Sequence, residues 1–260
     1  MILSREILED LKSFIELEEY IFNESMKSRI YVGTSGWLYS WNIGGSLDWY
    51  ARESGLNAVE LNASFYRYPT PSQISSWKAR GRGIRWSVKI HRIISHVYRL
   101  SQRSYESWRR FSDLFNPMRD LIDFYLLQLP PSYILKDENI ERLRSFIKNS
   151  GADSQIAVEF RHRSWFERDP DELCGEMRGA VIVSVDSPQA SWFACCRGYL
   201  YLRLHGRSSW YLYEYSSDEL SEIARRIRDL NPENIYIFFN NDHWMLENAR
   251  TMKRILERIF

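Results

Sequence analysis

Polar and ionisable residues recur at the ends of short apolar segments of this 260-residue chain. Several of them share an i and i+2 spacing, which places two side chains on one face of a β-strand. A buried charge must pair with another charge or with a ligand, because leaving it unpaired costs several kcal/mol. The set therefore predicts one polar cleft, formed by Glu60, Asn62, Lys89, Gln128, Glu159, Arg161, Asp186, Arg203, His205 and Asn240.

These residue types favour an enzyme that acts on a phosphate-containing substrate, such as a small molecule or a nucleic acid. Cationic side chains bind phosphate oxygens through charge-assisted hydrogen bonds, and a carboxylate with a histidine can transfer protons. We expect Lys89, Arg161 and Arg203 to hold the anion, with Glu60 or Glu159 as general base and His205 as general acid. Asp186 completes the catalytic candidates, and Asn62, Asn240 and Asn241 are expected to orient the substrate.

Three other functions compete with this hypothesis. Two carboxylates, Glu60 and Glu159, are what a glycoside hydrolase needs, although a neutral sugar needs no cations. Glu60, Glu159, Asp186 and His205 could bind a divalent metal ion, but no HxH or HExxH motif is present and the nearby cations would repel the ion. We therefore predict no cofactor, although a divalent metal ion stays an alternative.

The third alternative function is a barrel that binds nucleic acid or another ligand without catalysis.

A strongly basic segment keeps nucleic acid among the expected ligands. The chain has 35 basic and 34 acidic residues, yet the segment from Lys78 to Arg110 contains ten Lys or Arg and one acid, Glu106. Aromatic residues are interleaved with these cations, and such a stripe can follow a polyanion. The alternative is a solvated surface with ordinary ion pairs.

Eight short strand-like segments must position these side chains. They are rich in Val, Ile, Tyr and Phe and alternate with helical patterns. We expect the strands at 30–35, 57–62, 85–90, 122–128, 156–161, 180–186, 199–205 and 235–240. Eight such units predict an α/β TIM (β/α)8 barrel, whose active sites lie where the strands end.

The predicted barrel is a single domain over residues 29–260, preceded by a helical extension over residues 1–28. Helices are expected to open at Ser46 and Ser72, to cover 102–116, to start at an Asp137 cap, and to span 169–178, 216–229 and 246–259. Residues 187–198 lack a clear helix, so the sixth crossover is expected to be abbreviated.

Cysteine usage and hydropathy set the expected environment. The chain has three cysteines, Cys174, Cys195 and Cys196, without CxxC spacing, and we expect reduced, mostly buried thiols. No apolar run is long enough to span a membrane and the N-terminus does not resemble a signal peptide, so a cytoplasmic protein is expected. The sequence does not predict an oligomeric state.

Aromatic residues in the expected loops suggest how a ligand is bound, and a series of motifs indicates a family resemblance. Trp37, Tyr66 and Trp165 lie in expected loops beside the cleft, where flat side chains suit stacking on a sugar or a base. The motifs GTSGW, VELNASFY, WSVK, ISH, QLPPS, VEFRHRSW, VDSP, YLRLHG and FNN occur in this order between Gly33 and Asn241. The chain therefore resembles the YecE-like family, also called domain of unknown function 72. The resemblance implies a TIM barrel over about residues 30–256, and His96 matches the family's histidine, whereas Ile90 and His91 replace its small residue and proline.

Overall fold

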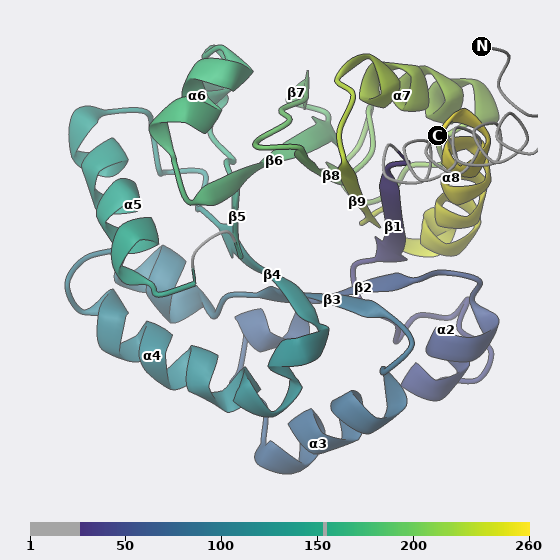
Figure 1. Cartoon of the computed structure of the whole chain (residues 1–260), viewed down its shortest axis with the longest axis horizontal. Helices are drawn as coiled ribbons and strands as arrows, with labels where there is room; N and C mark the ends of the chain where they lie inside the picture. The colour runs from purple at the N-terminus through teal and green to yellow at the C-terminus, as the bar shows by residue number, and fades with distance from the viewer. Residues whose placement is uncertain (1–26, 153–154) are drawn as a thin grey trace, which may run out of the picture.

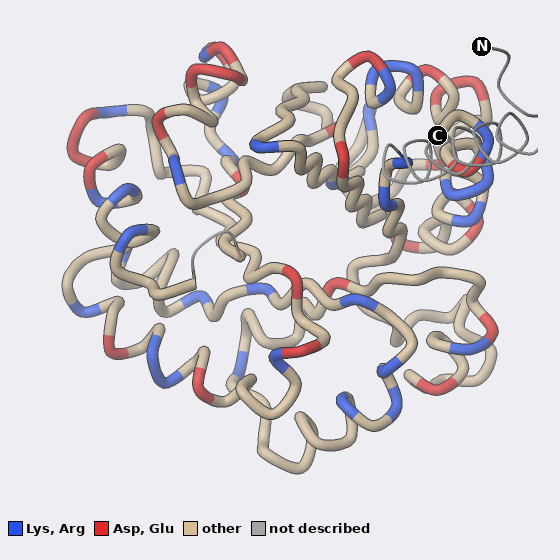
Figure 2. The backbone as a smooth tube through the Cα atoms, in the orientation of Figure 1, with Lys and Arg blue, Asp and Glu red and all other residues tan. Residues whose placement is uncertain are grey.

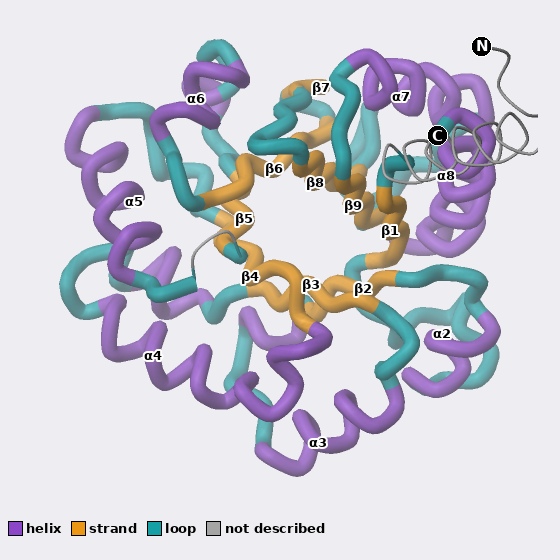
Figure 3. The backbone as a smooth tube through the Cα atoms, viewed as in Figure 1, coloured by secondary structure: helices purple, strands orange, loops and turns teal. Residues whose placement is uncertain are grey.

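A closed ring of eight parallel strands forms the centre of the molecule (Figures 1 and 3). The computed structural model describes residues 27–152 and 155–260. β1 pairs with β2 on one side and with β9 on the other, and β5 pairs with β6, which closes the ring. The barrel strands are β1 (Arg29–Thr34), β2 (Ala58–Leu61), β3 (Arg85–Lys89), β4 (Ile122–Gln128), β5 (Ile156–Glu159), β6 (Ala180–Ser187), β8 (Tyr199–Leu204) and β9 (Asn234–Phe239). The TIM-barrel prediction is confirmed.

Helices surround the strands in the order that the sequence predicts (Figure 3). The α-helices are α2 (Leu47–Glu53), α3 (Pro71–Arg80), α4 (Ser104–Phe115), α5 (Asp137–Asn149), α6 (Pro170–Glu176), α7 (Ser217–Asp229) and α8 (Met245–Ile259). The predicted N-terminal helix falls on residues 1–26, outside the described part of the chain. No helix in the described part is long and apolar enough to cross a membrane.

Side-chain caps explain where several helices start. Ser46 accepts a hydrogen bond from the backbone N–H of Trp49, and Ser216 forms a reciprocal capping box with Glu219. Such caps satisfy N–H groups that have no partner inside the helix. Two predicted starts differ by about one residue. Thr70, not Ser72, caps α3, and Asp137 lies inside α5 because Lys136 takes the extended cap conformation.

A short antiparallel strand replaces the helix of the sixth crossover. β7 (Ala190–Trp192) folds back on β6, with Asp186 opposite Ser191. This return brings Cys196 beside α6, where it forms a disulfide with Cys174 across a Cα–Cα distance of 5.4 Å. The expectation of three reduced thiols is therefore wrong, and only Cys195 is free. Linear spacing could not show this pair, because the hairpin return that joins the two segments is a tertiary feature.

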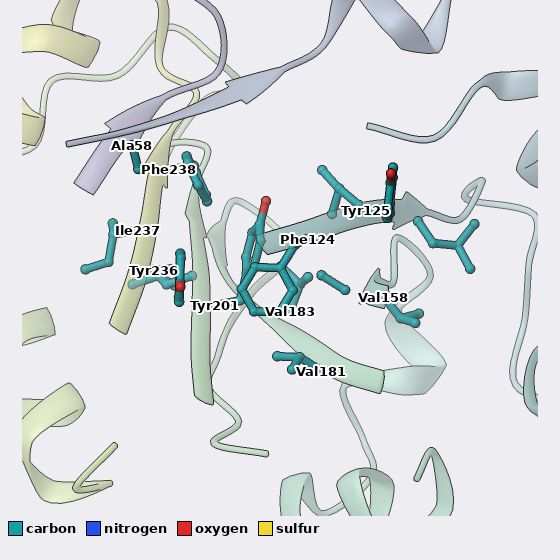
Figure 4. Packing of buried hydrophobic residues seen from close by; sticks show 14 of the residues in the cluster. Ala58, Phe124, Tyr125, Val158, Val181, Val183, Tyr201, Tyr236, Ile237 and Phe238 are labelled. Carbon is teal, nitrogen blue, oxygen red and sulfur yellow. The ribbon is translucent and has the colours of Figure 1, made fainter. Parts of the chain in front are cut away.

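Aromatic side chains fill the barrel below the polar layer. Phe124 of β4 packs edge-on against Tyr201 of β8 and Tyr236 of β9, with ring centroids 5.3 and 4.9 Å apart. Figure 4 shows Phe124, Tyr201 and Val183 together inside the ring of strands. This packed floor closes the barrel and leaves the strand C-termini as its open end, called the mouth below.

Candidate functional site

A buried ion network lies directly above the aromatic floor. The Arg203 guanidinium binds Glu60 Oε1 through Nη2 at 2.6 Å and Glu159 Oε2 through Nη1 at 2.5 Å. All three side chains are fully buried. One cation therefore bridges two carboxylates from strands that are separated by β3 and β4, and this pairing offsets the cost of burying the charges.

Strand alternation explains how these residues meet. Glu60 of β2 also accepts hydrogen bonds from Ser35 Oγ at 2.9 Å and from the Tyr201 hydroxyl at 2.8 Å. Tyr201 and Arg203 are two residues apart on β8, so both point into the barrel. The carboxylate of Glu60 is thus saturated with donors.

His205 extends the network upward as a neutral imidazole. Its Nε2 lies 2.9 Å from Glu159 Oε1, and its Nδ1 lies 3.2 Å from Asn240 Nδ2. Arg161 Nη2, which can only donate, also lies 3.3 Å from Nε2, so Nε2 faces both a donor and a carboxylate acceptor. Burial, together with the charges of Arg161 and Arg203, lowers the pKa of His205 to about 3. His205 is therefore poorly suited to the predicted role of general acid.

Glu159 is held as a carboxylate. Arg161 Nε lies 2.8 Å from its Oε1, on the same face of the chain two residues further on. Burial acts to raise the pKa of Glu159, but the charges of Arg161 and Arg203 hold it well below its usual range. A carboxylate so strongly bound is a weak base, so Glu159 is better suited to position its neighbours than to transfer protons.

Lys89 is the exception among the inward-facing charges. It projects from β3 beside this network, yet its ammonium group makes no hydrogen bond or ion pair with any described residue. Nζ instead lies 4.3 Å from the centroid of the Phe65 ring. Burial and the charge of Arg203 lower the pKa of Lys89 to about 7. Lys89 is thus a partly exposed amine that can change its charge near neutral pH.

The loops beside Lys89 form an electropositive region around His96. Burial and the charges of Lys89, Arg92, Arg161 and Arg99 lower the pKa of His96 to about 4. Lys89 ends β3, Arg92 and Arg99 lie on the segment that follows β3, and Arg161 lies just after β5. Arg92 is exposed to solvent. Such an arrangement of positive charge favours the binding of an anion.

Two inward-facing amides lack hydrogen-bond partners. Asn62 Oδ1 and Gln128 Oε1 are buried and accept no hydrogen bond from the described residues. These residues follow or end β2 and β4, the two strands that flank Lys89. Asn62 also lines a cavity of about 510 Å³, and Arg161 lines another of about 750 Å³. A bound molecule with hydroxyl or amine donors would satisfy both oxygens.

Asp186 does not join the predicted cleft. Its carboxylate accepts hydrogen bonds from Ser191 at 2.9 Å and Tyr215 at 2.8 Å, on the outer side of β6. The i and i+2 rule places Ser184 and Asp186 on a common face but does not say which face that is. Val183 and Val185 occupy the inward positions of this strand, so the prediction for Asp186 is wrong.

Other predicted ligand-binding residues serve the packing around the mouth. Trp165 is fully buried, stacks on Phe160 at 4.0 Å and donates to the carbonyl of Tyr133. Asn241 is also buried and anchors the loop after β8 through the carbonyl of Tyr213. Trp37 is almost buried, although it lines the 510 Å³ cavity. Tyr66 is 70% exposed on the loop after β2.

Several residues of the site are not among the sequence predictions. Ser35 and Tyr201 bind Glu60, Phe65 contacts Lys89, and Trp210 covers Arg161 at 4.8 Å in a cation–π contact. Tyr201 could have been predicted, because it lies two residues before Arg203 on β8 and therefore faces the same side of the strand. Ser35 and Phe65 follow the ends of their strands, where alternation no longer predicts direction.

The basic segment does not form a continuous surface stripe. Lys78 pairs with Asp120, Arg80 pairs with Asp48, and Arg85 pairs with Asp123 at the far end of the barrel. Figure 2 shows basic and acidic residues interleaved around the helices. Lys89 lies inside the mouth, whereas Arg109 and Arg110 lie on α4. Only the part near Arg92 and Arg99 adds positive charge to the site.

The described residues contain no group of three or more His, Cys, Asp or Glu side chains that could hold a metal ion. Glu60 and Glu159, two of the carboxylates predicted as possible ligands, are bound to arginines inside the barrel. Asp186, on the outer face, is bound by Arg207 at 3.4 Å and by the hydroxyl groups of Ser191 and Tyr215.

Comparisons with known proteins agree with this architecture. The chain is similar to a DUF72 family protein from Thermotoga maritima, with 26% identity, a TM-score of 0.73 and coverage of 88% of this chain and 99% of that one. A DUF72 family protein from Enterococcus faecalis has 21% identity, a TM-score of 0.74 and coverage of 89% and 99%.

A more distant similarity concerns the fold alone. D-psicose 3-epimerase from Clostridium cellulolyticum H10 shows 12% identity and a TM-score of 0.53, with coverage of 88% of this chain and 96% of that one. No curated protein matches the chain. A family model described as a protein of unknown function, DUF72, matches residues 31–259. The chain therefore belongs to the DUF72 family.

Proposed function

We propose that this protein is an enzyme that acts on a small phosphate-containing molecule bound at the mouth of the barrel. The observation that carries the proposal is the positive charge at the mouth beside Phe65: Lys89 Nζ lies 4.3 Å from the centroid of that ring, His96 packs against the same ring at 5.0 Å, and Arg92 is exposed on the segment that follows β3. Arg203 is fully buried and already binds two carboxylates, so the predicted role of Arg203 in holding the anion passes to the outer arginines.

Lys89 is the reactive group in this proposal. Its amine lacks a partner and has a pKa of about 7, so both protonation states are present at neutral pH. The network of Glu60, Glu159 and Arg203 fixes the floor of the site. A glycoside hydrolase would instead need a carboxylic acid that stays protonated, and the lowered pKa of Glu159 argues against that alternative.

Binding of inorganic phosphate tests the anion site. We expect isothermal titration calorimetry to detect binding to the wild-type protein, and Arg92→Gln to weaken it by roughly 10- to 100-fold. Loss of a charge-assisted hydrogen bond of about 1.5–3 kcal/mol gives a change of this size. Arg109→Gln on α4 is the matched control and is expected to bind phosphate as the wild type does.

Activity provides the second arm of this test. Lys89→Met is expected to abolish turnover of the responsive member of a panel of phosphorylated small molecules, whereas the exposed Lys148→Met retains it. Equal phosphate affinity in the Arg92 and Arg109 variants would overturn the assignment of the anion site.

A further inference from the structure

Lys89 has the surroundings of a nucleophilic amine. Its side chain is partly exposed at the mouth, and its Nζ lies 4.3 Å from the centroid of the Phe65 ring without a hydrogen bond or ion pair to any described residue. The charged groups that act on it come from several elements: Glu60 on β2, Glu159 and Arg161 at β5 and Arg203 on β8. Because both acids are bound to arginines, neither neutralises the lysine directly.

We propose that Lys89 condenses with the carbonyl group of its substrate, and that this substrate is a phosphorylated hydroxy-aldehyde or hydroxy-ketone. The inference rests on the anion site proposed above and names the substrate class of that site. The cations around His96 receive the phosphate, and the lysine amine receives the carbonyl carbon. A lysine placed next to other cations and partly removed from water is the usual form of such a nucleophile.

The unpartnered amides account for the hydroxyl groups of this substrate class. Asn62 Oδ1 and Gln128 Oε1 are buried acceptors without donors among the described residues. Asn62 follows β2 and Gln128 ends β4, the two strands next to β3. A buried acceptor that lacks a donor costs about 1–3 kcal/mol. A substrate hydroxyl on each side of the carbonyl would remove this cost, which a simple aldehyde or an inorganic anion would not do.

The covalent step is balanced by water and a proton. The neutral Nζ attacks the carbonyl carbon, and the carbonyl π electrons pass to its oxygen, which takes up a proton to give a carbinolamine. The oxygen then leaves as water after a second protonation, and the nitrogen loses one of its protons and forms the C=N bond of an iminium ion. Overall, the carbonyl compound, the neutral amine and one proton give the iminium ion and one water. The pKa of about 7 leaves a large neutral fraction of Lys89 for this attack.

Borohydride trapping tests the proposal. The full-length protein is incubated with D-ribulose 5-phosphate, whose carbonyl has a hydroxyl group on each side, and with sodium borohydride, which delivers hydride to the iminium carbon and fixes a stable secondary amine. Peptide mapping by mass spectrometry is expected to find one dominant adduct on Lys89, and inorganic phosphate is expected to suppress it. Glycerol 3-phosphate, which lacks a carbonyl group, is expected to leave no adduct.

Variants of the protein test whether the adduct forms specifically on Lys89. Lys89→Arg retains the positive charge and is expected to lose the adduct, whereas Lys148→Arg on α5 retains it. Gln128→Leu is expected to slow trapping by roughly tenfold, since one hydroxyl loses its acceptor. Adducts spread over surface lysines, or equal labelling of the Lys89→Arg protein, would overturn the proposal. Phosphate binding that depends on Arg92 without an adduct on Lys89 would overturn this inference alone, and the proposed function would stand.

Discussion

At the residue scale, most charged side chains of the site pair with one another, and one amine has no polar partner. Glu60, Glu159 and Arg203 saturate one another, whereas Lys89 has no polar partner among the described residues. Perturbed pKa values mark functional sites, but ion networks perturb them as well. The available amine is therefore a stronger functional candidate than the carboxylates that the residue types first favoured.

His205 gives a test of the buried network through pH-dependent stability. Its folded-state pKa of about 3 lies below the value of about 6.5 expected in the unfolded chain. The unfolded chain therefore binds the extra proton first, and the stabilisation from neutral His205 is lost as pH falls from about 6.5 towards 3. We expect His205→Gln to reduce the slope of unfolding free energy in this window by about 1.4 kcal/mol per pH unit.

Urea unfolding at several pH values between about 4.5 and 7 measures this slope. Gln can still donate to Glu159, so the variant removes the titration and keeps a hydrogen bond. His243→Gln, on the exposed surface, is the matched control and is expected to leave the slope in place. A wild-type slope in the His205 variant would contradict the buried, neutral imidazole.

At the element scale, close pairing of β1 and β2 brings Ser35 to Glu60. The two strands pair only at Gly33 with Ala58 and Thr34 with Val59. A Cβ atom at Gly33 would overlap the backbone carbonyl of Ala58, so only glycine permits this approach. The geometry of the site thus depends on a residue that carries no chemistry.

Gly33→Ala is expected to destabilise the fold by about 1–3 kcal/mol, because the strands must separate to accept the methyl group. Gly83→Ala is the matched control, since no atom lies within 4 Å of its added Cβ, and its effect is expected to stay within about 0.5 kcal/mol. Denaturant unfolding of both variants measures the difference. Equal stability of the two would show that β1 and β2 are not held at this distance.

At the scale of the whole molecule, the mouth is the face that differs from the rest. Nine large hydrophobic side chains are exposed among the described residues, and all except Leu230 lie on loops that follow the C-terminal ends of strands. The eight residues on these loops are Leu38, Ile43, Tyr66, Val97, Ile134, Tyr211, Leu212 and Trp244. Exposed apolar side chains gathered on one face indicate a binding surface.

The distribution of charge predicts weak binding of nucleic acid. The cations between Lys78 and Arg110 are divided among the far end of the barrel, its interior and α4, and several pair with acids. Fluorescence anisotropy with short DNA and RNA is expected to show weak affinity with a shallow dependence on salt, because few phosphates can be contacted at once. Tight binding with a steep dependence on salt, reduced by Arg92→Glu with Arg99→Glu, would restore the polyanion hypothesis.

The barrel and most of the residues at its mouth can be predicted from the sequence. Eight apolar segments with helical spacers predict the ring, because parallel strands covered by helices must be apolar and close at eight. Polar residues at the strand ends predict Glu60, Lys89, Glu159, Arg161 and Arg203 at one end, where the structure places them. Only the tertiary structure decided that Asp186 faces outward, that Cys174 meets Cys196, and which charges pair. Alternation fixes relative faces along one strand, whereas the absolute face, the disulfide and the unpartnered amine depend on contacts between segments distant in the chain.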